Sequence, residues 1–168
     1  PLKFEEWNVA FLIIGLLKSL SSLLFAALIC YLLYSFNIFS LGLYLIPFFI
    51  ILIMFGWAVG FFIAGIILRY GTRLQTLAWT VIMLFSPFSA IYYPLSTLPL
   101  WAQQVAYFIP TSYIFEGGRK VLLFHEQLGW DYFLVPFLLT GVYLILAVIW
   151  AKNSFLTILD KKGLIKVF

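Results

Sequence analysis

The chain has 168 residues, of which 65% are hydrophobic and only 10% are charged, and its mean hydropathy is +1.12. Such a chain would aggregate as a soluble domain, so the composition indicates an integral membrane protein. A single cysteine, Cys30, and a single histidine, His125, exclude an internal disulfide, a cysteine cluster and a histidine metal site. We therefore expect no metal and no cofactor. The net charge of +4 is expected to reflect membrane topology and contact with anionic lipid, and nothing suggests nucleic acid.

Four apolar runs are long enough to cross a bilayer, which takes about 20 helical residues. They are continuous rather than alternating, and this favours helices over a β-barrel. The predicted fold class is an all-α integral membrane protein with four transmembrane helices and an outward-facing re-entrant helical hairpin, in one domain. The predicted spans are 8–36, 41–68, 74–93 and 132–151, with the hairpin at 95–124 and a cytoplasmic tail at 152–168.

The first predicted span contains one ionisable residue, Lys18, beside Ser19 and two further serines. A charge inside a span is typical of a translocation path or of a contact with a partner. Alternatively, the span is longer than the bilayer is thick, and Lys18 extends its amine to the cytoplasmic headgroups. Both interpretations stay open.

The second predicted span carries Gly56, Gly60 and Ala64 at four-residue spacing. Small residues at this spacing let two helices approach closely. The partner helix is either a neighbouring span of the same chain or the same span of a second copy.

The stretch from Pro94 to Leu123 lies among these apolar runs and contains Pro94, Pro99 and Pro110. Proline lacks an N–H donor and clashes with the preceding helical turn, so the stretch cannot be one spanning helix. We predict two short helices, at about 98–108 and 112–124, broken at Ile109-Pro110. Their lengths of about 16 and 20 Å fall short of the ~30 Å hydrocarbon core. Such a broken segment survives at membrane depth only where protein or water covers it.

The second short helix carries Glu116, Arg119 and Lys120, three and four residues apart. If these side chains are exposed, the ion pairs contribute little stability. If Glu116 and Arg119 form a buried pair that braces the hairpin, the loss of Glu116 alone costs more than the loss of both. The spacing does not separate these alternatives.

Lysine and arginine are distributed unequally over the predicted loops. One side of the four-span arrangement holds seven of them, and the other side holds only Arg119 and Lys120. The positive-inside rule therefore places both termini in the cytoplasm and the region 94–130 outside. The seven are Lys3, Arg69, Arg73, Lys152, Lys161, Lys162 and Lys166.

Several motifs of energy-coupled or catalytic proteins are absent from the sequence. It has no GxxxxGK[ST] phosphate loop, no GxSxG and no HExxH. The last three predicted spans have no charged residue except at their ends. Carriers driven by an ion gradient usually keep an acidic or histidine relay at mid-membrane. Catalysis and ion-coupled transport by this chain are therefore disfavoured.

The segment Ser86–Arg119 resembles the signature of the type 2 ATP-binding-cassette exporter permeases. That signature has an aromatic–Pro–Leu end to the fifth span, a Leu–Pro–x–Trp element, a proline-broken hairpin and a Glu–x–x–Arg. The corresponding elements here are Tyr93-Pro94-Leu95, Leu98-Pro99-Leu100-Trp101, Pro110-Thr111-Ser112-Tyr113 and Glu116-Gly117-Gly118-Arg119. The resemblance implies that the four spans are the last four of six. It also implies that two earlier spans and an amphipathic helix are missing, in accord with Pro1 as the first residue.

The resemblance also implies a mechanism and its partners. Such permeases form homo- or heterodimers in the membrane and bind nucleotide-binding ATPase subunits or domains on the cytoplasmic face. Short coupling segments transmit the motion of the ATPases, and here they would be Lys3–Trp7 and Arg69–Gln75. The coupling residues would be Glu5, Glu6, Trp7, Arg69 and Arg73, and those of the hairpin Pro94, Pro99, Trp101, Pro110, Glu116, Gly117 and Arg119.

We therefore expect a permease subunit of an ATP-driven exporter, without catalysis of its own, in the cytoplasmic membrane of a prokaryote. A secondary carrier or channel is the first alternative, and a membrane-embedded assembly scaffold is the second. The sequence does not select a substrate.

Overall fold

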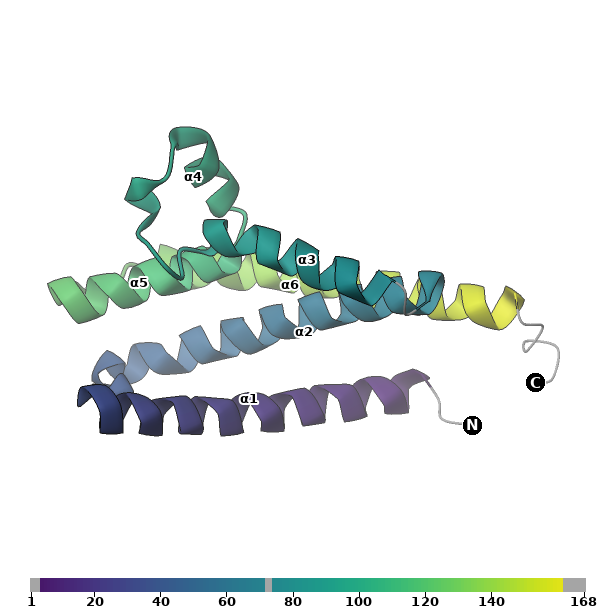
Figure 1. Ribbon diagram of the computed structural model, residues 1–168, viewed down its shortest axis with the longest axis horizontal. Coiled ribbons are helices and arrows are strands. Elements are labelled where there is room, and N and C mark those ends of the chain that lie inside the picture. The colour runs from purple at the N-terminus through teal and green to yellow at the C-terminus, as the bar shows by residue number, and fades with distance from the viewer. Residues whose placement is uncertain (1–3, 72–73, 162–168) are drawn as a thin grey trace.

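The computed structural model describes residues 4–71 and 74–161, and the regular structure within these stretches is entirely helical (Figure 1). The predicted all-α class is thereby confirmed for the described residues. In chain order the elements are α1 (Phe4–Tyr34), η1 (Ile38–Tyr44), α2 (Leu45–Tyr70), α3 (Gln75–Phe85), η3 (Ser86–Ser89), η4 (Leu95–Thr97), α4 (Leu100–Ala106), α5 (Pro110–Phe124) and α6 (Asp131–Lys161).

Three helical segments in the described part of the chain are long and apolar enough to cross a membrane. They are Val9–Tyr34, Ile38–Tyr70 and Asp131–Ile158. They correspond to the first, second and fourth predicted spans. The beginning of α1, the end of α2 and the end of α6 lie at the same end of the bundle (Figure 1). The first two spans run antiparallel, as the short connection between them predicted.

The third predicted span, 74–93, is not one continuous α-helix in the structure. Its α-helical part, α3, has only 11 residues, which corresponds to about 16 Å. Pro87 has no N–H to donate to the carbonyl of Met83, and the Ser86 N–H takes up that carbonyl in a tighter turn. A short 3₁₀ turn, η3, follows, and Ala90 ends it in the left-handed conformation with φ 57°.

The tail predicted at 152–168 does not begin at residue 152, because α6 continues to Lys161. The sequence has no glycine or proline from 142 to 161 that would end the helix. The part of α6 beyond the predicted span also packs on one side, because Ser154 is buried whereas Lys152 and Asn153 are exposed.

The core of the bundle is the interface between α2 and α6. Its centre is made of small side chains around one large ring: Ala58 and Phe61 from α2 meet Ala147 and Ala151 from α6. A Cβ atom on Gly65 would lie 2.4 Å from the Trp150 indole and 3.3 Å from the Ala151 Cα. The two helices approach closely here because glycine and alanine leave room for the Trp150 ring.

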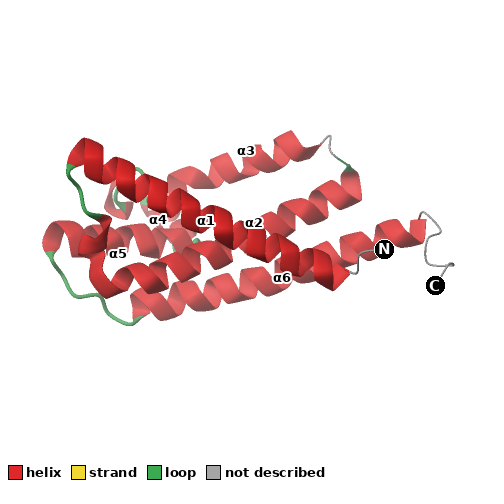
Figure 2. Ribbon diagram, turned by 90° about the horizontal axis from the view of Figure 1, so that it is seen from below, coloured by secondary structure: helices red, strands yellow, loops and turns green. Residues whose placement is uncertain are grey.

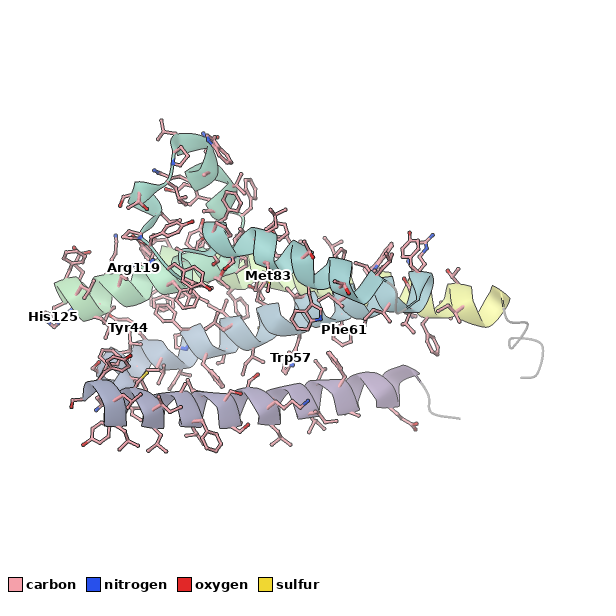
Figure 3. All side chains as sticks on the ribbon, in the orientation of Figure 1. Tyr44, Trp57, Phe61, Met83, Arg119 and His125 are labelled. Carbon is pink, nitrogen blue, oxygen red and sulfur yellow. The ribbon has the colours of Figure 1, made fainter. Side chains whose placement is uncertain are left out.

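Helix α1 crosses the bundle obliquely and contacts it in few places (Figure 2). The Phe11 ring packs over Gly60 and lies 5.2 Å from the Phe61 ring, measured between centroids. Trp57 points from α2 toward α1 (Figure 3), where a Cβ on Gly15 would lie 2.8 Å from its indole nitrogen. The other side chains of α1 whose burial is described are exposed or half-buried.

The contacts of α1 show which members of the ladder of small residues Gly56, Gly60 and Ala64 in α2 pack inside the subunit. Gly60 packs against α1 of the same chain, and Ala64 is half-buried. A Cβ on Gly56 would meet nothing within 4 Å. Within the described residues, only part of the ladder is thus used for packing inside the subunit.

The two glycines Gly65 and Gly56 allow a matched test of the α2–α6 interface. We expect Gly65→Ala to lower the free energy of unfolding by about 1–3 kcal/mol, because the added methyl group meets the Trp150 ring. Gly56→Ala should leave stability unchanged or raise it, since the new methyl group has open space and alanine favours the helix. Thermal unfolding in detergent measures both. Equal melting temperatures for the two variants would contradict the close contact.

Candidate functional site

The hairpin between α3 and α6 is built around its prolines, as predicted. Pro99 precedes α4 in an extended conformation, and Pro110 is the first residue of α5. Ile109 is extended as well, with φ −104° and ψ 111°, so the break falls at Ile109-Pro110. The helices have 7 and 15 residues, or about 11 and 23 Å, and neither would cross a ~30 Å core.

Side-chain hydrogen bonds close the break between the two hairpin helices. Ser112 is 1% exposed, and its hydroxyl lies 2.6 Å from the Ala106 carbonyl oxygen and 2.7 Å from that of Ile109. The Tyr143 hydroxyl of α6 donates to the Phe108 carbonyl at 2.8 Å. Backbone carbonyls exposed by the proline break thus receive donors from α5 and α6.

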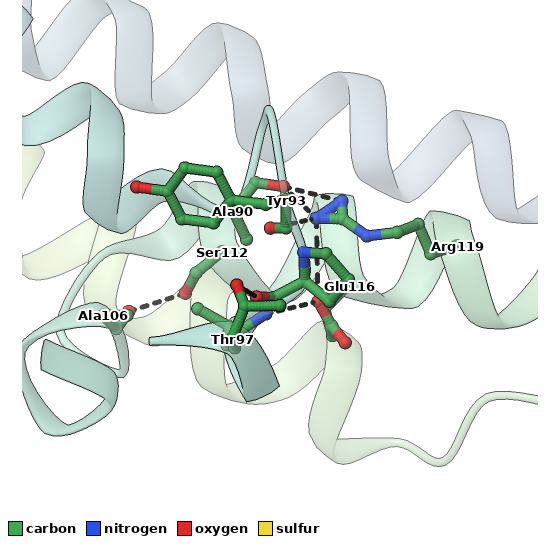
Figure 4. A network of polar contacts seen from close by, with 9 residues as sticks. Ala90, Tyr93, Thr97, Ala106, Ser112, Glu116 and Arg119 are labelled. Carbon is green, nitrogen blue, oxygen red and sulfur yellow. Dashed lines mark hydrogen bonds and ion pairs between the residues drawn. The ribbon is translucent and has the colours of Figure 1, made fainter. Parts of the chain in front are cut away.

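Arg119 holds the hairpin against the end of α3 (Figure 4). Its Nη1 donates to the Ala90 carbonyl at 2.7 Å, and its Nη2 donates to the same oxygen and to the Tyr93 carbonyl at 2.7 Å. Ala90 is fully buried and ends η3 in a left-handed conformation, where its carbonyl has left the helical ladder. Arg119 therefore caps this chain turn from α5, and we call the set Arg119, Ala90 and Tyr93 the arginine clasp.

Glu116 completes the contact between α5 and the segment after η3. Its carboxylate lies 3.7 Å from Nη2 of Arg119, and the Leu95 N–H donates to it at 3.4 Å. The two side chains are 24% and 22% exposed, so the pair is half-buried. The pair contacts the segment after the third predicted span, and its half-buried position lies between the exposed and the buried alternatives. Because Arg119 also has two carbonyl acceptors, removal of Glu116 does not leave the guanidinium unpaired.

Gly117 and Gly118 follow Glu116, but only the first is constrained by its neighbours. A Cβ on Gly117 would lie 3.1–3.2 Å from side chains of Phe48, Tyr132 and Leu128, whereas one on Gly118 would meet nothing within 4 Å. Gly117 therefore lets α5 lie close to α2 and α6.

Lys120 and Trp101 have contacts outside the arginine clasp. The Lys120 amine lies 5.1 Å from the centre of the Tyr132 ring and 4.0 Å from the Glu126 carboxylate. A hydrogen bond with the Tyr132 side chain, aided by the nearby acidic groups, raises the pKa of Lys120 above its ordinary value. Trp101 is 63% exposed, and its ring contacts only the edge of Phe88, at 6.0 Å between centroids, among the aromatic pairs described.

The predicted coupling residues lie at the opposite end of the bundle, where they are described. Arg69 is exposed in the last turn of α2, and Glu6 is exposed in the first turns of α1. From Phe4 onward the segment Lys3–Trp7 is part of α1 itself rather than a separate helix. Lys3 and Arg73 lie outside the described residues, as do the side chains of Glu5 and Trp7.

Lys18 is exposed on α1, about 14 Å along the helix from Val9, where the first spanning segment begins. Its backbone carbonyl accepts a hydrogen bond from the Ser21 hydroxyl at 2.9 Å. The structure leaves both interpretations of its amine open.

Sequence reasoning missed the acceptors of the arginine clasp and the two hydroxyl donors, Ser112 and Tyr143. Carbonyl acceptors carry no side-chain signal, so Ala90 and Tyr93 were not predictable. Ser112 does have one, because a hydroxyl just after a proline break can bond backbone groups freed by that break.

Residues 8–123 match the family described as ABC-2 type transporter. The chain belongs to this family. The matched region covers more than half of the 168 residues and includes the hairpin and the arginine clasp. No curated protein and no solved structure matches the chain. As an ABC-2 membrane domain, the chain is an integral membrane permease and is not itself catalytic.

The arginine clasp predicts an order of mutational effects on the permease. We expect Arg119→Gln to lower the free energy of unfolding by about 2–3 kcal/mol, because it removes charge-assisted hydrogen bonds to two carbonyls. Glu116→Gln should cost about 1 kcal/mol or less, since it removes one long, half-exposed ion pair. Lys120→Gln is the matched control on the same helix. Denaturant titration in detergent gives the three values, and a larger loss for Glu116→Gln than for Arg119→Gln would contradict the clasp.

Proposed function

We propose that the chain is the transmembrane permease of an ATP-driven exporter and that it forms the substrate path with a second permease copy. The observation that carries this proposal is membership of the ABC-2 transporter family over α1–α5. Since the sequence has no phosphate-loop motif, the energy would come from ATPase subunits or domains that bind it. Co-purification of a nucleotide-binding subunit or domain with the permease tests the proposal. Repeated purification without one would favour a carrier, a channel or a scaffold.

The proposed orientation has the beginning of α1 and the ends of α2 and α6 in the cytoplasm and the hairpin facing outward. Support comes from the seven-to-two charge count and from the position of those three helix ends at one end of the bundle (Figure 1). In this orientation the hairpin enters the outer leaflet without crossing it and covers the outer end of the substrate path. The arginine clasp and the Tyr143 hydroxyl support a re-entrant position, because they satisfy carbonyls that lipid could not.

Cysteine labelling tests this orientation. In a chain with Cys30 replaced, we expect a membrane-impermeant maleimide added from outside to label Glu126→Cys strongly and Tyr70→Cys not at all. Both positions are exposed, so accessibility within the protein does not limit the reaction. Tyr70 is a better site than the adjacent Gly71, whose φ of 86° disfavours a side chain. The reverse labelling pattern would overturn the orientation.

The turn after α2 is the proposed contact with the ATPase. We expect Arg69→Glu combined with Arg73→Glu to lower substrate-stimulated ATP hydrolysis severalfold in the full assembly, because two basic side chains at the contact become acidic. Lys152→Glu, an exposed charge reversal on α6, serves as the control. ATPase activity is measured after the amount of inserted permease has been matched. Equal stimulation in the double variant and the control would remove this turn from the coupling surface.

A further inference from the structure

An apolar groove of about 1050 Å³ lies within this single subunit, between α2 and α6 on one side and α3, η3 and α4 on the other. One wall is a face of α2 that includes Phe55, Val59, Phe62 and Ile66. These residues recur at helical spacing, so they form a continuous stripe along the helix. The lining of α6 includes Tyr143, Leu146 and Trp150, spaced by three and four residues.

The length of the groove corresponds to one leaflet of a bilayer. From Phe55 to Ile66 the helix rises about 16 Å. The hydrocarbon core is ~30 Å thick, so each leaflet contributes about half of that distance. The α2 stripe lies within the spanning segment Ile38–Tyr70 and ends close to its C-terminal limit. A lipid chain lying along this stripe would therefore extend from the headgroup level to about mid-membrane.

A fixed cation lies at the headgroup end of the groove. Arg69 follows Ile66 by three residues and Phe62 by seven, on the same face of α2. Its guanidinium carbon lies 5.3 Å from the centre of the Trp150 ring, and that ring lies 6.4 Å from the Phe62 ring, between centroids. Both rings line the groove. The Arg69 guanidinium therefore lies next to the aromatic rings that line this end of the groove.

We infer that this groove binds an anionic phospholipid, with one acyl chain along the α2 stripe and the phosphate at Arg69. An apolar groove of leaflet length fits an acyl chain, and an arginine at the membrane surface attracts an acidic headgroup. Charge complementarity at Arg69 selects an anionic lipid over a zwitterionic one. The inference does not rest on the ATPase or on the substrate path between permease copies, although Arg69 is also one residue of the proposed ATPase contact.

Native mass spectrometry of the purified permease, with the subunits that it retains, tests whether the groove binds an anionic lipid in preference to a zwitterionic one. The probes are phosphatidylglycerol and phosphatidylcholine with identical acyl chains. We expect the anionic lipid to be retained about fivefold better, which is the preference typical of one basic residue at a membrane surface. Arg69→Gln should abolish the preference, and Arg69→Lys should keep most of it. Equal retention of both lipids by the wild type, or an unchanged preference in Arg69→Gln, overturns the inference.

A second pair of variants tests the acyl-chain part of the groove without touching the charge. Leu146 and Ile149 are both exposed on α6, 59% and 51%, but only Leu146 lines the groove. Leu146→Trp should reduce retention of the anionic lipid severalfold, because the indole fills the groove, whereas Ile149→Trp should not. Equal retention in the two variants overturns the inference. Both measurements are made without ATP, so their failure leaves the proposed exporter function untouched, and failure to find an ATPase leaves the lipid site untouched.

Discussion

The structure depends on supplying hydrogen-bond donors to backbone carbonyls where the chain leaves its helices. In a membrane protein no solvent can do this at hydrocarbon depth, and each unsatisfied carbonyl is costly. Pro87 ends α3, and Ala90 then turns the chain in a left-handed conformation. The guanidinium of Arg119 donates to the carbonyls that this turn releases, from 26 and 29 residues away in sequence. One side chain thus stabilises the break in α3 and fixes the position of α5.

The hairpin as a whole is also held in place by hydrogen bonds and close packing. Helix α5 is held by Arg119 and by the close approach at Gly117. The short α4 contacts η3 and η4, and the hydrogen bond from Ser112 to the Ala106 carbonyl joins it to α5. The Ser112 and Tyr143 hydroxyls then satisfy carbonyls at the proline break. The hairpin is therefore a braced structure rather than a loop, although α4 has only 7 residues.

The interface between α2 and α6 is tightly packed, whereas α1 contacts the rest of the bundle in few places. Small residues bring α2 and α6 together around Phe61, and this interface places Phe62 and Trp150 along one groove. The few contacts of α1 include Phe11 over Gly60 and Trp57 beside Gly15. The difference follows from side-chain size, because bulky residues cover most of α1 whereas α2 and α6 carry alanine and glycine where they meet.

The order of the residues was enough to predict the membrane class, the helical fold, three segments long enough to span and the break at Ile109-Pro110. These features are local: they depend on the length of apolar runs and on the missing N–H of proline. The sequence also contains Pro87. The run from Leu74 to Tyr93 is predominantly apolar and was therefore predicted as one span, although Pro87 ends α3. The tertiary structure alone decided the partners of Arg119, the division of roles between Gly60 and Gly56, and the groove that ends at Arg69. These features depend on backbone carbonyls and on helix faces from distant parts of the chain, and neither produces a pattern in the order of the residues.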